Sequence, residues 1–311
     1  MTSMLVGYTG FVGSNISAAA KEAESPFTWE INTSNKEAAF DKKPELLIYA
    51  GLRAEKFLAN KDPEKDLLKI EEAMQQIEKI APKKLVLIST VDVYQNPVDV
   101  DEDTKIKTQG LLPYGKNRYE LEKWVQSYKE DALIIRLPGL YGRNLKKNFI
   151  YDYIHVIPSM LKEEKYEELA GKSNLITQSY RKLNNGFYQC NVREEDTDKL
   201  KQEFLSVGFS ALNFTDSRGV FQFYHLKNLW KDINIALEHQ LHLLNIATQP
   251  VSVAEIYRSL SGKEFVNEIT LTPPFYDYRT KYANLFGGKD GYFSTKEQVL
   301  ADITKFVKQE M

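Results

Sequence analysis

The chain has few of the residues that build disulfides and metal centres. Its 311 residues include one cysteine, Cys190, and four histidines. A lone cysteine excludes an internal disulfide, and the histidines are scattered without metal-ligand spacing, so we expect a reducing compartment and a site without a metal ion. An excess of one charge is missing too: 41 basic and 43 acidic residues give a formal net charge of −2. This balance argues against a nucleic-acid partner.

Long hydrophobic runs are also absent from the sequence. No apolar run approaches the roughly 20 residues that a membrane-spanning helix needs. Only Met1, Thr2 and Ser3 precede the first apolar segment, and they carry no targeting signal. We therefore expect a cytoplasmic protein without a membrane partner. Apolar residues make up 42% of the chain, which suits a large core in one large domain or two joined ones.

The most informative segment is MLVGYTGFVGSN, residues 4–15, in which an apolar strand leads into three glycines and then a helix start. Without side chains at Gly7, Gly10 and Gly13, backbone N–H groups and the positive end of the helix can approach a pyrophosphate. This spacing predicts a dinucleotide site. The alternative is a tight strand-to-helix turn in some other α/β protein.

Apolar strands and amphipathic helices alternate through the first half of the chain. We expect strands over residues 26–31, 46–51, 85–90 and 132–137, and helices over 14–23, 62–80 and 114–128. A further helix over 229–237 and a strand over 243–247 follow the less regular segment 149–220. Regular alternation of this kind predicts an α/β fold with a Rossmann-like, doubly wound parallel sheet.

The change of pattern near residue 145 predicts two parts. We expect a dinucleotide-binding domain over residues 1–145, to which residues 222–247 return. Residues 146–221 and 248–311 are expected to form a smaller C-terminal substrate-binding lobe, laid over the carboxyl edge of the sheet, where ligands of such sheets bind.

Seven segments occur in a recognisable order: GYTGFVGS, YAG, LISTVDVY, YGKNRYELEKWV, RLPGLYGRN, FQFYHLKNL and LLNIATQPVSVAEI. Together they resemble an extended short-chain dehydrogenase/reductase of the NAD(P)-dependent epimerase/dehydratase family, whose members largely act on nucleotide-activated sugars. The resemblance covers most of the chain.

The resemblance implies a catalytic set of Thr90, Tyr114 and Arg118. The tyrosine exchanges a proton with the substrate, and Thr90 hydrogen-bonds the reacting oxygen. The family usually has lysine where Arg118 stands; a cation four residues beyond the tyrosine shares its helix face and can hold the cofactor ribose. Arginine keeps the charge, but its planar fork puts the lysine's proton relay in doubt. Tyr119 and Lys123 repeat the spacing on another face of the helix.

The same resemblance implies the residues that bind the cofactor. They are Gly7, Thr9, Gly10, Phe11, Val12, Gly13, Asn32, Ala50, Gly51, Leu52, Ser89, Tyr114, Arg118 and Leu137. The second strand ends in Asn32-Thr33-Ser34-Asn35, which offers hydrogen-bond donors to a 2′-phosphate and no carboxylate to ribose hydroxyls. We therefore favour NADP over NAD, unless Glu30 serves as the ribose acceptor.

Substrate contacts are implied for Thr90, Asp92, Asn148 and Arg218. Dehydratases of the family carry adjacent Asp-Glu after the threonine, and this chain has Val91-Asp92 instead, which favours reduction or epimerisation. Asp92 either contacts the substrate or is a solvated turn carboxylate. Arg218 suits a diphosphate; for Asn148 and Arg218 alike the alternative is a surface role. The tyrosines and cations of residues 276–281 either close the pocket or pack.

These features predict an oxidoreductase that passes hydride between a nicotinamide and a nucleotide-linked deoxysugar, most simply a 4-keto-sugar reductase in polysaccharide precursor synthesis. A nucleotide-sugar epimerase would use the same groups and stays open. A non-catalytic dinucleotide-binding sensor or assembly protein also stays open, because the usual lysine is missing. The resemblance further implies a possible homodimer through the helices expected over 62–80 and 114–128.

Overall fold

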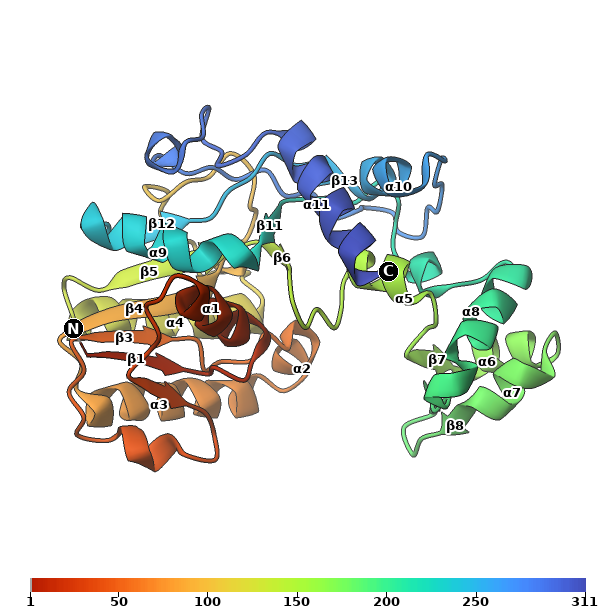
Figure 1. Cartoon of the computed structure of the whole chain (residues 1–311), viewed down its shortest axis with the longest axis horizontal. Helices are drawn as coiled ribbons and strands as arrows, with labels where there is room; N and C mark the ends of the chain where they lie inside the picture. The colour runs from red at the N-terminus through yellow and green to blue at the C-terminus, as the bar shows by residue number, and fades with distance from the viewer. Residues whose placement is uncertain (1) are drawn as a thin grey trace. The chain divides into compact units, whose positions relative to one another are not determined.

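The structure is a computed structural model that describes residues 2–311, and it divides into two compact units (Figure 1). The first unit holds the chain up to Asn144, together with Val220–Val251 and Phe275–Asp302. The second unit holds Leu145–Gly219, Ser252–Pro274 and Ile303–Met311. None of the helices in the described chain has the length and apolar character of a membrane-spanning segment.

A six-stranded parallel sheet forms the centre of the first unit, which confirms the predicted fold class. Its strands are β1 (Ser3–Val6), β2 (Trp29–Ile31), β3 (Leu46–Tyr49), β4 (Lys84–Thr90), β5 (Leu133–Leu137) and β12 (Leu243–Asn245). They lie in the order β12-β5-β4-β3-β1-β2, and every pairing is parallel. The order reverses between β1 and β3, and sheets of this kind bind ligands outside the carboxyl ends of the strands at that point.

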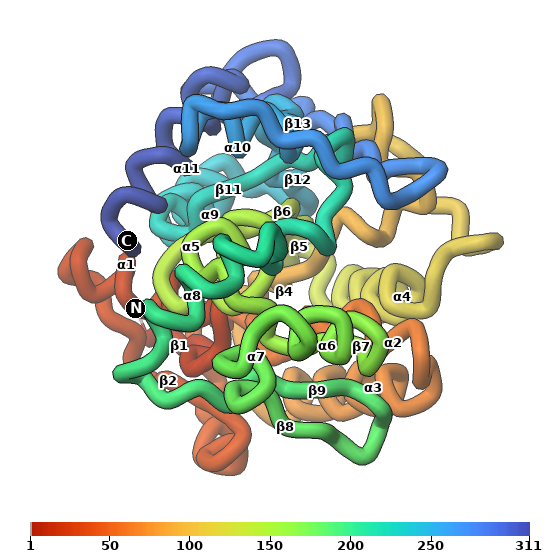
Figure 2. Tube along the Cα trace, turned by 90° about the vertical axis from the view of Figure 1, so that its right-hand side faces the viewer, coloured from red at the N-terminus to blue at the C-terminus, as the bar shows by residue number. Residues whose placement is uncertain are grey.

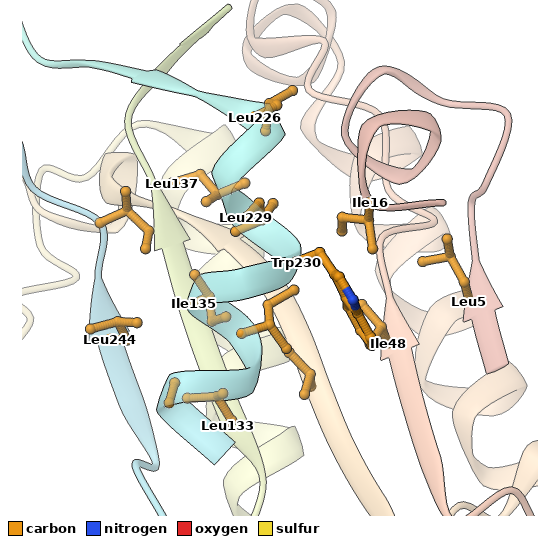
Figure 3. Packing of buried hydrophobic residues seen from close by; sticks show 14 of the residues in the cluster. Leu5, Ile16, Ile48, Leu133, Ile135, Leu137, Leu226, Leu229, Trp230 and Leu244 are labelled. Atoms are coloured by element: carbon orange, nitrogen blue, oxygen red, sulfur yellow. The ribbon is translucent and has the colours of Figure 1, made fainter. Parts of the chain in front are cut away.

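Helices cover both faces of this sheet. The helix α1 (Phe11–Glu22) and the helix α9 (Leu229–Glu238) pack on one face, where Ile16 and Trp230 meet buried strand residues (Figure 3). The helices α3 (Pro63–Ile80) and α4 (Pro113–Tyr128) pack against the other face. Burial on both sides explains why the strands are continuous apolar runs. Leu67 and Leu68 of α3 are exposed, and the homodimer through α3 and α4 stays a prediction.

Local sequence signals fix the helix starts. Asp62 caps α3 by accepting a hydrogen bond from the Lys65 N–H at 3.1 Å, and Pro63 occupies the first turn. The helix α1 begins at Phe11 rather than at the expected Ser14, because Gly10 is its N-cap and accepts from the Ser14 N–H at 2.8 Å. The glycine turn therefore leads directly into the helix.

Shorter elements complete the first unit. They are α2 (Lys56–Lys61), the 3-10 turns η1 (Lys36–Ala39), η2 (Val91–Val93), η5 (Leu226–Asn228) and η6 (Ala283–Phe286), and the strands β6 (Gly139–Tyr141), β10 (Val220–Phe221) and β11 (Phe223–His225). The strands β6 and β11 pair in parallel.

The segment Phe275–Asp302 groups with the first unit, whereas the sequence analysis assigned residues 248–311 to the smaller lobe. Tyr278 shows why: it is fully buried, its N–H donates to Gln222 Oε1 at 2.9 Å, and its hydroxyl donates to the Ile246 carbonyl at 2.9 Å. Aromatic side chains near the C-terminus thus complete the core of the first unit.

The second unit contains a small antiparallel sheet in the order β7-β9-β8. Its elements are α5 (Phe149–His155), β7 (Met160–Lys162), α6 (Glu163–Ala170), α7 (Asn174–Ser179), β8 (Tyr180–Lys182), β9 (Phe187–Cys190), the turn η3 (Glu194–Asp196), α8 (Thr197–Ser206), the turn η4 (Ala211–Phe214), α10 (Val253–Ser261) and the end of α11 (Lys296–Glu310). Leu161, Tyr180 and Phe204 belong to its apolar cluster. The strand β13 (Val251–Ser252) stands where the chain passes between the units.

A buried ion pair ties α4 to β5 beneath the carboxyl edge of the large sheet. Glu122 is fully buried and accepts from Arg136 at 2.6 and 3.1 Å, as well as from the Ser89 hydroxyl. Arg136 also donates to the Tyr94 hydroxyl at 2.8 Å. Every charge in this network has hydrogen-bonded partners, as buried charges require.

We predict that Glu122→Gln lowers the free energy of unfolding by about 3 kcal/mol, because it leaves the Arg136 charge buried without its carboxylate. Urea unfolding followed by circular dichroism measures this. Glu120→Gln is the matched control, since Glu120 pairs with Lys123 on the exposed side of the same helix and should change stability by less than about 1 kcal/mol. Equal effects of the two substitutions would contradict the prediction.

Candidate active site

The glycine turn lies at the reversal point of the sheet and depends on missing side chains. Gly7 has φ +90°, and a Cβ atom there would lie 2.3 Å from the Ala50 carbonyl oxygen. A Cβ atom on Gly13 would lie 2.1 Å from the Gly7 carbonyl oxygen. Gly10 is less constrained, with the same oxygen 3.2 Å away. The turn is therefore packed against the end of β3, which brings the predicted cofactor residues of both segments together.

The start of α1 has the features of an anion site. Gly10 is an N-cap without a side-chain hydrogen bond, so the N–H groups of Phe11, Val12 and Gly13 have no acceptor within the helix. These groups and the helix dipole favour a negative charge at this end. Thr9 and Gly10 are exposed. The cradle fits the pyrophosphate of a dinucleotide, because side chains are absent where the phosphates would approach.

The loop after β2 presents amide and hydroxyl groups. The Asn32 side chain accepts from the N–H of Ser34 at 2.9 Å and from its hydroxyl at 2.7 Å. Asn35 accepts from the Asn32 N–H at 2.7 Å. Glu30 is engaged elsewhere: its carboxylate accepts from the Ser17 hydroxyl and pairs with Lys21 at 3.2 Å. The loop itself therefore has no carboxylate directed at a ribose.

The remaining predicted cofactor residues lie along the carboxyl ends of β3, β4 and β5. Leu52 follows β3 and packs against the second core cluster. Gly51 is also close-packed, since a Cβ atom there would lie 3.1 Å from the Val6 side chain. Leu137 is buried and lies in register with Thr90. Ser89 lies in the buried network with Glu122, so its hydroxyl already has a partner.

Thr90 and Tyr114 are brought together although they are far apart in the sequence. Thr90 ends β4, and Tyr114 is in the first turn of α4, where its N–H donates to Asn60 Oδ1 at 2.9 Å. Burial raises the pKa of the Tyr114 hydroxyl above its ordinary value near 10, an effect opposed by Arg118 and by a hydrogen bond with Thr90 and reinforced by the Asp92 carboxylate. Tyr114 therefore holds its proton at neutral pH.

Arg118 lies beneath the tyrosine ring and is committed to another helix. Its guanidinium carbon is 4.7 Å from the centre of the Tyr114 ring. Its terminal nitrogens donate to the two Asp66 carboxylate oxygens at 3.1 and 3.2 Å and to the Arg53 carbonyl at 3.2 Å. Asn117 donates to the same carboxylate at 3.0 Å. Arg118 and Asp66 are each only 5% exposed, so the fork joins α4 to α3.

A cavity of about 180 Å³ opens beside Thr90. Its lining includes Asp92, Leu137, Gln222, Tyr276 and Tyr278. Gln222 is saturated, because its amide donates to the Thr248 and Tyr278 carbonyls at 2.6 and 2.9 Å and its oxygen accepts from the Tyr278 N–H. The threonine, aspartate and tyrosine side chains of this otherwise apolar lining suit a ligand with hydroxyl groups.

Lys56 belongs to this region and was missed by the sequence analysis. Its ammonium group lies 2.8 Å from Asp92 Oδ1 and 3.4 Å from the Tyr276 hydroxyl, which donates to the same oxygen at 3.1 Å. Burial lowers the pKa of Lys56, but Asp92 and Tyr276 outweigh it and raise the pKa above the ordinary value. The available signal was position: Lys56 opens α2, soon after the carboxyl end of β3.

The two remaining predicted substrate residues lie in the second unit and make contacts there. Asn148 caps α5 by accepting from the Tyr151 N–H at 3.1 Å. Arg218 donates to Asp216 at 2.9 and 3.0 Å and to the Thr270 carbonyl at 2.6 Å, and these hydrogen bonds hold the pKa of Asp216 far below its usual range. A role of Asn148 or Arg218 toward a substrate stays a prediction.

Residues 1–162, more than half of the chain, match the family model of the RmlD substrate binding domain. No curated protein sequence matches the chain.

Solved structures resemble the chain over nearly its whole length. RMD from Pseudomonas aeruginosa complexed with NADPH has a TM-score of 0.63 at 15% identity, covering 100% of both chains. dTDP-4-dehydrorhamnose reductase from Bacillus anthracis in complex with NADP has a TM-score of 0.63 at 15% identity, covering 99% of both chains. UDP-glucose 4-epimerase from Thermotoga maritima with UDP-glucose has a TM-score of 0.61 at 14% identity, covering 99% of this chain and 98% of the other. At these identities the likeness shows a shared fold.

We predict that Arg118→Met lowers the free energy of unfolding by about 3 kcal/mol, because it leaves Asp66 buried without a cation. The double variant Arg118→Met/Asp66→Leu should recover most of this loss, since both charges are then replaced by apolar groups. Urea unfolding of the two variants measures the difference. If Arg118 instead holds a ligand, Arg118→Met will keep its stability and lose ligand affinity.

Proposed function

Because the chain belongs to the family of the RmlD substrate binding domain, we propose that it is a nicotinamide-dependent oxidoreductase that reduces a keto group on a nucleotide-linked deoxysugar. The observation that carries this proposal is the pair of Thr90 and Tyr114, held at the carboxyl edge of a doubly wound sheet where Thr90 lines a cavity. A 4-keto sugar is the substrate we favour.

In the proposed reaction the Thr90 hydroxyl hydrogen-bonds the substrate's carbonyl oxygen and Tyr114 donates its proton to that oxygen. Burial keeps the proton on Tyr114 until the oxygen becomes negative, so the group acts as a general acid. Asp92 and the Tyr276 hydroxyl lie on the same cavity wall and are suited to sugar hydroxyls. The chain's task is thus to position one carbonyl group and to supply one proton.

The cofactor we propose is NADP, with NAD as the alternative. Bound nicotinamide in its reduced form supplies hydride. The glycine turn and the start of α1 would hold its pyrophosphate. The loop after β2 supports the choice of NADP, because its residues 32–35 include no carboxylate that would repel a 2′-phosphate.

Epimerisation stays the second candidate, since it would use the same Thr90 and Tyr114. It must begin by removing a proton from a substrate hydroxyl, which requires a tyrosinate. Reduction is the candidate that we favour, because the chain matches the family model of the RmlD substrate binding domain. A non-catalytic sensor is less well supported, because a binding protein has no need of a buried acid beside Thr90.

We predict that Tyr114→Phe lowers kcat by at least about 100-fold and leaves cofactor affinity within about threefold, since only the proton donor is lost. The assay follows oxidation of NADPH, and separately of NADH, with TDP-, UDP- and GDP-linked 4-keto-6-deoxysugars. Tyr119→Phe, on another face of the same helix, is the control and should keep full activity. Full turnover by Tyr114→Phe would refute the reductase and the epimerase alike. Isomer formation without net oxidation would identify an epimerase.

The pH dependence of reduction follows from the same proton. An acid with a raised pKa is active below that pKa and inactive above it, so kcat for reduction should be constant through neutral pH and fall only in alkaline solution. Oxidation of the corresponding alcohol should instead accelerate as pH rises. Initial rates in both directions across this range test the sign, and a reductive rate that increases with pH would contradict an acid role for Tyr114.

A further inference from the structure

A cluster of Lys56, Asp92 and Tyr276 borders the cavity and has no role in the proton transfer described above. Its three side chains come from α2, from the turn η2 and from the segment after α10 that returns to the first unit. Asp92 Oδ1 accepts hydrogen bonds from Lys56 at 2.8 Å and from the Tyr276 hydroxyl at 3.1 Å. The Lys56 side chain is 43% exposed and that of Asp92 is 21% exposed. Asp92 and Tyr276 thus line the cavity, and Lys56 binds both of them.

The cation that the family resemblance assigns to the tyrosine is shared with another helix. Arg118 is held by both Asp66 oxygens and by the Arg53 carbonyl, and it lies under the ring of Tyr114. Its charge is largely balanced by the buried carboxylate of Asp66. Arg118 still favours a tyrosinate at Tyr114, and Lys56 is a second and smaller source of positive charge.

The charged groups that act on Tyr114 come from three elements. Arg118 on α4 and Lys56 on α2 favour the ionised hydroxyl, and Asp92 in η2 opposes it. Figure 2 shows α2 and α4 close together, with α3 beside them. The carboxyl group of Asp92 would repel a tyrosinate if it stood alone, and its ion pair with Lys56 offsets that repulsion.

We propose that Lys56 is a positioning residue of the reaction, which binds Asp92 and thereby prevents this carboxylate from opposing the negative charge that develops on the Tyr114 oxygen. The inference rests on the proposed reductase function. The hydride that a bound nicotinamide would supply would form a C–H bond at the carbonyl carbon, and the C=O π pair would move to the substrate oxygen. As the Tyr114 O–H bond breaks, its proton passes to that oxygen. The electron pair of the broken bond stays on the tyrosine oxygen, which later regains a proton from water.

The decisive variant is Lys56→Met, which keeps most of the side chain's length and removes its charge. The proposal predicts about a tenfold lower kcat for reduction at neutral pH with little change in KM. It also predicts that the alkaline limb of the pH profile moves upward by about one pH unit, because an unpaired Asp92 makes the tyrosine harder to ionise. A merely structural role of Lys56 would leave that limb in place.

Three further variants make the test specific. Lys56→Arg keeps the charge and should retain the wild-type pH profile. Lys69→Met removes a cation that pairs with Glu55 at 3.5 Å, outside the cluster, and should leave kcat unchanged. In an Asp92→Asn background, Lys56→Met should cost no more than about threefold in kcat, because the repelling charge is already gone.

The outcomes separate this inference from the proposed function. An active wild type, an inactive Tyr114→Phe variant and a Lys56→Met variant with unaltered kcat and pH profile would overturn the role of Lys56 alone. The same loss with and without Asp92 would also overturn it, since the effect would not act through the carboxylate. A wild type that consumes no cofactor with any 4-keto sugar would overturn both.

Discussion

The close approach of α4 to the turn after β4 is the constraint on which the site depends. A Cβ atom on Gly115 would lie 2.0 Å from the Asp92 carbonyl oxygen, so only glycine allows the first turn of α4 to rest there. Because Tyr114 precedes this glycine and Thr90 precedes the turn, the approach brings the two hydroxyl groups within hydrogen-bonding reach. A bulkier residue would move the helix and separate the acid from the group that positions the substrate.

The buried and the partly exposed ion pairs near Tyr114 have different roles. Arg136 with Glu122 and Arg118 with Asp66 are deeply buried, and each joins α4 to a neighbouring element. Such pairs gain little net stability over apolar packing, but losing one partner is costly, so they specify how the helix sits. Lys56 with Asp92 is partly exposed and borders the cavity. A charge in that position can respond to a ligand, whereas the buried charges cannot.

Much of the fold followed from the sequence because its signals are local. Apolar runs, the cap at Asp62 and the glycine turn each depend on a few neighbouring residues, and they predicted the sheet and its helices. The return of Tyr278 to the first unit could not be predicted in this way, since it depends on hydrogen bonds to Gln222 and Ile246, distant in the chain. The same holds for the antiparallel sheet of the second unit, whose strands are three or four residues long.

The same distinction between local and distant signals decides which parts of the site could be predicted. Thr90 and Tyr114, which the family motifs predicted, lie together. The partners of Arg118 and Asp92 could not be predicted, because ion pairs join distant segments that share no sequence pattern. This explains how arginine can stand where a lysine is usual. Its fork fits the two oxygens of Asp66 on α3, which a lysine could bind at only one point. The substitution therefore couples two helices through one carboxylate, and Arg118 shares its electrostatic effect on the tyrosine with Lys56 on a third helix.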